Sequence, residues 1–161
     1  MQYSDIIFGD QNEWEIASGV PHIPFEALDA DYEIDKEAYL EYFRKMHQLF
    51  PKCKKMVMAV RNQIASSHHT LSGLLYDAVE DQLYTTRIYD IEPIVDPMGV
   101  GDAFIAAYIH AHQKWGDKNQ YCLDFSLSAS AIKNTIPGDQ NLVSEEEIIS
   151  NMTSSGGRIQ R

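Results

Sequence analysis

Cysteine is scarce in this sequence, and long apolar runs are missing. The chain has 161 residues, and its two cysteines, Cys53 and Cys122, lie far apart in no spacing typical of a metal site. We therefore expect reduced thiols and a cytoplasmic protein. No window is apolar over the roughly 20 residues that span a bilayer. The first residues lack a basic stretch followed by an apolar one, so we expect neither membrane association nor a signal peptide.

Positive charge is also in short supply. The chain has 13 Lys and Arg against 24 Asp and Glu, which gives a net charge of −11. Such a chain repels phosphate backbones, so a nucleic-acid partner is not expected, and the acidity by itself indicates solubility. If the protein binds ATP, it must build a local positive site from backbone amides, a few basic side chains or a metal ion.

Strand-like and helix-like segments alternate along the chain, which is typical of an α/β fold in a single domain. The hydrophobic fraction of 44% is enough for a core. Three β-rich runs separated by Asp-containing turns predict a small meander, and residues 19–33 have an irregular composition. The expected strands cover residues 5–8 and 56–60, the meander residues 71–76, 82–86 and 91–95, and the helices residues 12–17, 35–50, 102–115, 121–132 and a short last one opened by Ser144.

The most informative run is Asp-Pro-Met-Gly-Val-Gly-Asp-Ala-Phe at residues 96–104, where a Gly-X-Gly turn leads directly into a helix. Glycines let a backbone approach a ligand closely. The first amide groups of a helix have no partner within the helix, and the helix dipole adds positive charge at that end. The run therefore predicts an anion site suited to phosphate.

A carboxylate beside a phosphate site needs its own explanation. Asp102 stands at the start of the predicted helix, where it has two possible roles. It can take the proton from a hydroxyl that attacks a phosphoryl group, or it can simply cap its helix, which is worth about 1 kcal/mol. The residue types alone leave both roles open.

The run at residues 96–104 resembles the signature of the ribokinase-like, or PfkB, sugar kinases. The resemblance implies that Asp102 is the catalytic base and that Gly99, Val100 and Gly101 form the anion hole. It also implies the C-terminal part of a ribokinase-like doubly wound sheet, with a small β-meander before the catalytic helix. ATP and Mg²⁺ are the cofactors to expect.

A second run narrows the resemblance to the 2-keto-3-deoxygluconate kinases. Residues 131–139 read Ala-Ile-Lys-Asn-Thr-Ile-Pro-Gly-Asp, and the chain ends Gly-Arg-Ile-Gln-Arg. The resemblance implies nucleotide-binding roles for Lys133, Asn134 and Gly138. Arg61 follows the strand at residues 56–60, in what we expect to be a turn, where it either meets nucleotide phosphates or is an ordinary solvated side chain.

The family has an Asn-X-X-Glu motif that organises Mg²⁺ and phosphate through water, and this chain offers two matches to it. Asp10 with Glu13 keeps the distance from the preceding strand, whereas Asn12 with Glu15 keeps the residue types. We prefer Asp10 and Glu13. An acidic first helical turn that only satisfies the helix dipole is the alternative.

The family's amino-terminal strands and sugar-covering lid have no counterpart in the sequence, so we expect an incomplete kinase domain over residues 1–161. The function it implies is phosphorylation of 2-keto-3-deoxygluconate by the parent enzyme. An inactive nucleotide-binding or assembly fragment, or a kinase for another sugar or a nucleoside, stays open. We expect the chain to form a homo-oligomer or to associate with the missing half, since uncovered strands leave an edge.

Overall fold

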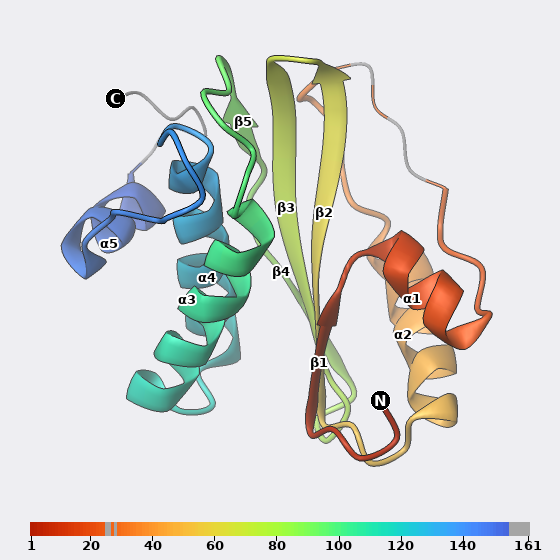
Figure 1. The fold of residues 1–161 in the computed structure, drawn as a ribbon. Coiled ribbons are helices and arrows are strands. Elements are labelled where there is room, and N and C mark those ends of the chain that lie inside the picture. The colour runs from red at the N-terminus through yellow and green to blue at the C-terminus, as the bar shows by residue number, and fades with distance from the viewer. Residues whose placement is uncertain (25–26, 28, 155–161) are drawn as a thin grey trace.

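The computed structural model describes residues 1–24, 27 and 29–154 of the chain. These residues form one mixed sheet with helices packed on both faces, the layered α/β arrangement that the sequence predicts (Figure 1). The strands are β1 (Ile6–Gly9), β2 (Lys55–Ala65), β3 (His68–Asp77), β4 (Gln82–Thr85) and β5 (Tyr89–Ile91), and the helices are α1 (Gln11–Ser18), α2 (Lys36–Leu49), α3 (Val100–Trp115), α4 (Asn119–Lys133) and α5 (Glu145–Thr153).

A long antiparallel hairpin of β2 and β3 is the centre of the sheet. Strand β1 pairs with β2 and is parallel to it, so that Phe8 stands opposite Val57. On the other side of the hairpin, β4 pairs with residues 74–77 of β3, and β5 pairs with residues 69–71. Both pairings are antiparallel, and together they form the small meander that the sequence predicts before the helix at Asp102.

Several expected boundaries were wrong, among them those of two strand runs. Strand β2 does not end at Val60 but continues to Ala65, so Arg61 lies in a strand and not in a turn. The cause is pairing, because β3 gives β2 a partner along this whole stretch. The run at residues 91–95 forms no strand beyond Ile91. Pro93 comes two residues later and has no N–H with which to continue a ladder.

The helix starts follow side chains that can be recognised in the sequence. Asp35 accepts a hydrogen bond from the Ala38 backbone and caps α2 as expected. Ser144 and Glu147 form the expected capping box at the start of α5. The described residues between α1 and α2 form neither helix nor strand, and among the described helices none is long and apolar enough to cross a membrane. The Gly-Arg-Ile-Gln-Arg end lies outside the described residues.

Each face of the sheet has its own apolar core. Successive side chains of a strand point to opposite faces. Met56 and Met58 therefore pack with α1 and α2, while Val57 packs on the α3 and α4 side. Figure 1 shows these two helix pairs on opposite sides of the sheet, with α5 outside α4. In Figure 1 the start of α3 lies near the level at which β1 ends, on the α3 and α4 side of the sheet.

Strand β1 pairs with β2 only, and its other edge has no partner strand within the described ranges. Ile7 is buried, but Ile6 and Phe8 are only partly covered. Apolar strands of this kind are usually covered on both faces and paired on both sides. An open edge beside half-covered apolar side chains is a surface on which another chain segment can add.

Candidate active site

The Gly-X-Gly turn forms the amino-terminal end of α3. Gly99 is the N-cap residue and adopts the left-handed conformation, with φ of 75°. A Cβ built on Gly99 would lie 2.3 Å from the backbone oxygen of Asp139. Glycine is therefore required twice here, once for the backbone conformation and once for the close approach of a second loop. The helix starts at Val100, two residues earlier than expected, which places Val100, Gly101 and Asp102 in its first turn.

Asp102 is exposed, and its carboxylate has no hydrogen-bond or ion-pair partner in the part of the chain that the structure describes. It is not the N-cap, because Gly99 takes that position. The simple capping role that the sequence left open is therefore not the one the structure shows. A free carboxylate beside unpaired helix amides is chemically able to accept a proton from a group held there.

The carboxylate of Asp96 fixes the Gly-X-Gly turn through hydrogen bonds to two backbone amides. Its Oδ1 accepts a hydrogen bond from the Met98 amide at 2.9 Å, and its Oδ2 accepts one from the Gly138 amide at 2.8 Å. These two hydrogen bonds, helped by the nearby charge of Lys133, hold the pKa of Asp96 below its usual value. The sequence analysis missed this role, although an Asp before Pro at a turn is a known signal for side-chain to backbone bonding.

The four residues expected to contact a nucleotide divide into two kinds. Arg61 and Gly138 are exposed. Lys133 and Asn134 are buried, with 0% and 2% of their surface exposed. The Lys133 ammonium donates to the backbone oxygen of Ile136, and the Asn134 amide donates to that of Ser130. The structure therefore corrects the expectation that Lys133 and Asn134 present their polar groups to a nucleotide, since both use them inside the protein.

Asp10 and Glu13 form a capping box at the start of α1. Asp10 Oδ1 accepts from the Glu13 amide at 2.8 Å, and Glu13 Oε2 accepts from the Asp10 amide at 2.9 Å. A capping box is thus present, and the second oxygen of each carboxylate has no hydrogen-bond partner among the described residues. In the alternative pair, Glu15 is engaged with His22. Glu13 and Glu15 each use only Oε2 in these contacts, so the choice of Asp10 and Glu13 stays a prediction.

The oxygen donors of Asp10 and Glu13 suit Mg²⁺, which prefers oxygen and keeps several water ligands. In the described part of the chain no group of three or more His, Cys, Asp or Glu residues could hold a metal alone. These two residues therefore fit a water-mediated contact to a Mg²⁺ ion that arrives with a phosphate, and not a closed metal cage.

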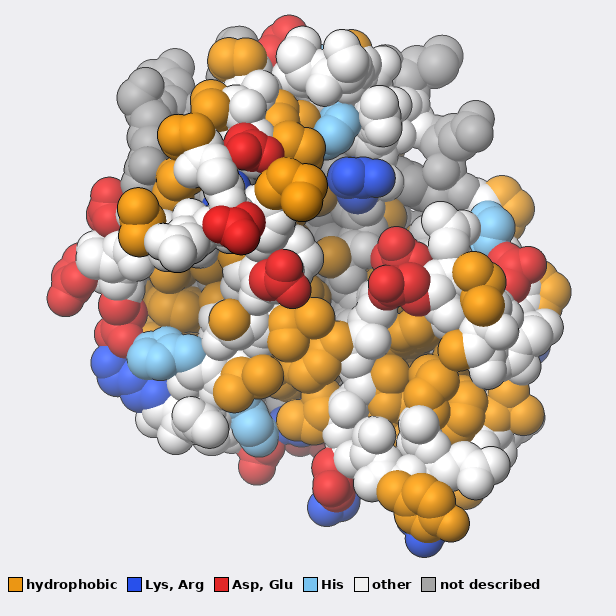
Figure 2. Space-filling view, in the orientation of Figure 1, with side chains coloured by type: hydrophobic (Ala, Val, Ile, Leu, Met, Phe, Trp, Pro, Cys, Tyr) orange, Lys and Arg blue, Asp and Glu red, His pale blue; other side chains and the backbone are white. Residues whose placement is uncertain are grey.

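Acidic side chains surround the upper centre of the face drawn in Figure 2, where the surface is hollowed between the helix pairs and one basic side chain stands nearby. Figure 1 places the starts of α1 and α3 near the end of β1, one on each side of the sheet. With few cations available, an anion in this hollow would depend on backbone amides and on any metal ion it carries.

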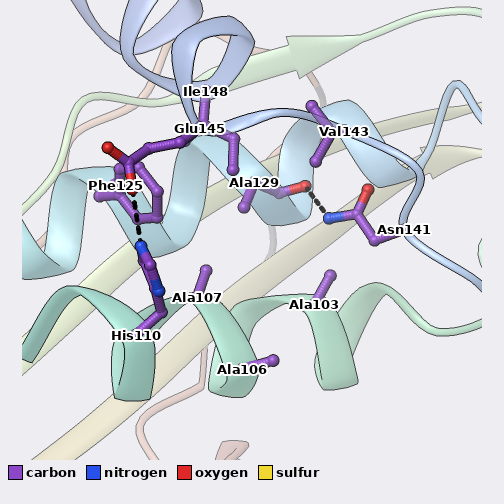
Figure 3. A pocket seen from close by; sticks show the side chains of 10 residues that line it. All are labelled: Ala103, Ala106, Ala107, His110, Phe125, Ala129, Asn141, Val143, Glu145 and Ile148. Atoms are coloured by element: carbon purple, nitrogen blue, oxygen red, sulfur yellow. Dashed lines mark hydrogen bonds and ion pairs between the residues drawn. The ribbon is translucent and has the colours of Figure 1, made fainter. Parts of the chain in front are cut away.

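A cavity of about 290 Å³ lies along α3 behind the turn (Figure 3). It begins at Ala103, one residue after Asp102, and an ion pair of His110 Nε2 with Glu145 Oε2 at 2.8 Å borders its other end. Its walls are mainly apolar, and small side chains leave the space open. The lining residues are Ala103, Ala106, Ala107, His110, Phe125, Ala129, Asn141, Val143, Glu145 and Ile148.

Comparison with known proteins gives one clear result. No family model and no curated protein matches the chain, but solved structures do. The first is a 2-dehydro-3-deoxygluconokinase from Thermotoga maritima, with a TM-score of 0.79 and 27% identity, covering 95% of this chain and 42% of the other. The fold is that of the ribokinase-like (PfkB) carbohydrate kinases. This bears out the resemblance seen at residues 96–104.

Two further structures agree. A PfkB family carbohydrate kinase from Listeria grayi has a TM-score of 0.72 and 26% identity, covering 93% of this chain and 41% of the other. A ribokinase from Arabidopsis thaliana, complexed with ribose and ATP, has a TM-score of 0.64 and 18% identity over 96% of this chain and 42% of the other. The chain thus spans about two fifths of the length of the PfkB kinases it matches, which is consistent with their C-terminal part.

The two glycines of the turn should respond oppositely to the same substitution. We expect Gly99→Ala to lower the free energy of unfolding by about 1–3 kcal/mol, because the new Cβ meets the Asp139 oxygen and φ is positive. Gly101→Ala is the control, since nothing lies within 4 Å of its Cβ position and alanine favours a helix. Denaturant unfolding of both variants measures this, and equal stability of the two would contradict the geometry.

Proposed function

We propose that this chain is the catalytic-base and phosphate-binding part of a sugar kinase that uses Mg·ATP. The observation that carries the proposal is the free carboxylate of Asp102 in the first turn of a helix, directly behind the anion turn at Gly99. Structural cappers of helices are bonded to backbone amides, and this carboxylate is not. The likeness to PfkB kinases over 95% of the chain supports the same conclusion.

In the proposed reaction the acceptor hydroxyl gives its proton to Asp102 as its oxygen bonds to the γ-phosphorus of ATP. The bond from that phosphorus to the β–γ bridging oxygen breaks, and ADP leaves with the electron pair. The amides of Gly99, Val100 and Gly101 face the negative charge that moves during transfer, and their fixed positions lower the barrier. Asp10 and Glu13 would hold a Mg²⁺ ion through water, and that ion would supply positive charge to the phosphates.

The remaining nucleotide contacts follow from exposure. Arg61 and Gly138 present a guanidinium and a backbone turn to solvent at this end of the sheet, and we assign them to the phosphates and ribose. The apolar cavity beginning at Ala103 can hold a purine base next to the turn. We propose that the protein is cytoplasmic and that its site takes small-molecule substrates, namely ATP and a sugar acid.

We propose 2-keto-3-deoxygluconate as the acceptor, phosphorylated at its terminal hydroxyl to give 2-keto-3-deoxy-6-phosphogluconate. Support comes from the run at residues 131–139 and from the higher identity to the Thermotoga maritima enzyme, 27%, than to the Arabidopsis thaliana ribokinase, 18%. Because the chain spans 42% of the Thermotoga enzyme, a nucleotide-binding or assembly fragment without turnover is the second candidate.

Replacement of the proposed base tests the function. In the chain's native assembly, Asp102→Asn should lower ADP release in the presence of 2-keto-3-deoxygluconate by roughly 10²–10⁴-fold, because proton transfer is lost. Mg·ADP affinity, measured by calorimetry, should change little. Asp139→Asn is the control, since it removes a neighbouring exposed charge without touching the base. Near-normal turnover of Asp102→Asn refutes the assignment, and nucleotide binding without turnover in the unmutated chain selects the second candidate.

The open edge of β1 leads to a proposal about assembly. Hiding a few hundred Å² of apolar surface yields several kcal/mol at about 25 cal/mol per Å², which is comparable with the whole stability of a domain. We therefore propose that the chain associates through β1, either with a second copy or with the segment that supplies the acceptor site. The half-covered Ile6 and Phe8 support this.

Sedimentation velocity over a hundredfold concentration range measures the association. We expect the isolated chain to form a dimer that dissociates on dilution, because the β1 edge can pair with its copy in a two-fold arrangement. Phe8→Lys should weaken the dimer, since it puts a charge beside that edge, whereas Ile109→Lys, at a residue that is 47% exposed on α3, should leave it unchanged. A single monomer at every concentration would contradict the proposal.

A further inference from the structure

Lys133 is a charged residue in an unusual place. It ends α4, its exposed fraction is 0%, and no carboxylate of the described residues lies within ion-pairing distance of its ammonium. The ammonium donates instead to backbone oxygens, to that of Ile136 at 2.9 Å and, more weakly, to that of Asp96 at 3.5 Å. Burying an ammonium costs several kcal/mol unless its surroundings replace water. The two backbone oxygens are therefore the groups that replace water around the ammonium.

The two oxygens belong to different loops. Asp96 lies in the segment that leads into the anion turn, and Ile136 lies in the loop that follows α4. The loops are joined further by hydrogen bonds from the Val95 and Asp96 amides to the Asn134 oxygen, at 2.8 and 3.2 Å. The ammonium thus sits where two loops, almost 40 residues apart in the sequence, converge.

The same loops determine the shape of the anion turn. Gly99 follows Asp96 by three residues, and its backbone approaches Asp139 so closely that no Cβ fits. Gly138, just before Asp139, donates to the Asp96 carboxylate. Ser130, one turn before Lys133 in α4, donates to the Val100 oxygen at 3.0 Å. Any displacement of the loops would therefore move the amides of Gly99 to Gly101.

We propose that Lys133 is a positioning residue whose buried ammonium acts as a built-in cation, holding the two loops, and with them the anion turn, in binding geometry. It does so without touching the nucleotide. Without its positive charge, the backbone oxygens of Asp96 and Ile136 would lose the donor that they share inside the protein. The link to phosphate binding rests on the proposed function, but the link to loop geometry does not.

Hydrogen exchange tests the loop geometry directly. Lys133→Met keeps the length of the side chain and removes the charge, so the amides of Met98 and Gly138, which both donate to Asp96, should exchange at least tenfold faster. Amides in the middle of α3 should not change. Lys118→Met is the matched control, because it removes an exposed Lys from the other end of the same helix and should leave both loops protected. Unchanged exchange at Met98 and Gly138 in Lys133→Met would overturn the proposal.

Chemical rescue tests whether Lys133 acts through its charge or through its packing. Ammonium chloride should restore slow exchange in Lys133→Met, and sodium chloride at the same ionic strength should restore it less. If this variant is unfolded, recovery of the fold with ammonium but not with sodium supports the proposal, and failure with both overturns it. Mg·ADP binding is measured in parallel. If the unmutated chain binds no nucleotide, the proposed function fails, while the exchange results still decide the role of Lys133.

Discussion

The meeting of two loops at the start of α3 is the constraint on which the rest of the site depends. Residues 95–99 and 134–139 are held together by backbone hydrogen bonds, by the Asp96 carboxylate and by the Lys133 ammonium. Gly99 can occupy its position only because it has no side chain. The helix amides behind it are then fixed in space, and fixed dipoles need no reorganisation when charge moves past them.

On the proposed function, this arrangement would let a chain with a net charge of −11 hold a phosphate. The positive potential would come from helix amides and from the buried Lys133 ammonium, and not from a surface patch of Lys and Arg. Asp96 is bonded to amides on both of its oxygens, whereas Asp102 has no partner among the described residues. The two nearby carboxylates thus have different surroundings, which suits the different tasks that we propose for them.

The local parts of the site could be predicted from the sequence because they depend on neighbouring residues. The anion turn needs only glycines before a helix, and the acidic first turn of α1 follows from its residue types, although the capping box of Asp10 and Glu13 was not predicted. That Arg61 lies in a strand could not be predicted in this way, because its partner in β3 is ten residues further along the sequence. Nor could the burial of Lys133, since the oxygen of Asp96 that it approaches lies 37 residues away. Strand pairing decided the first, and the approach of two distant loops decided the second.

The central claim is that the amides of Gly99, Val100 and Gly101 bind the phosphates of a nucleotide. Amide NMR of the ¹⁵N-labelled chain titrated with Mg·ADP measures this most directly. The account predicts that these three amides show the largest shift changes and that they saturate together, with smaller changes at Arg61 and Gly138. Saturable changes centred elsewhere, with the three amides unmoved, would contradict it.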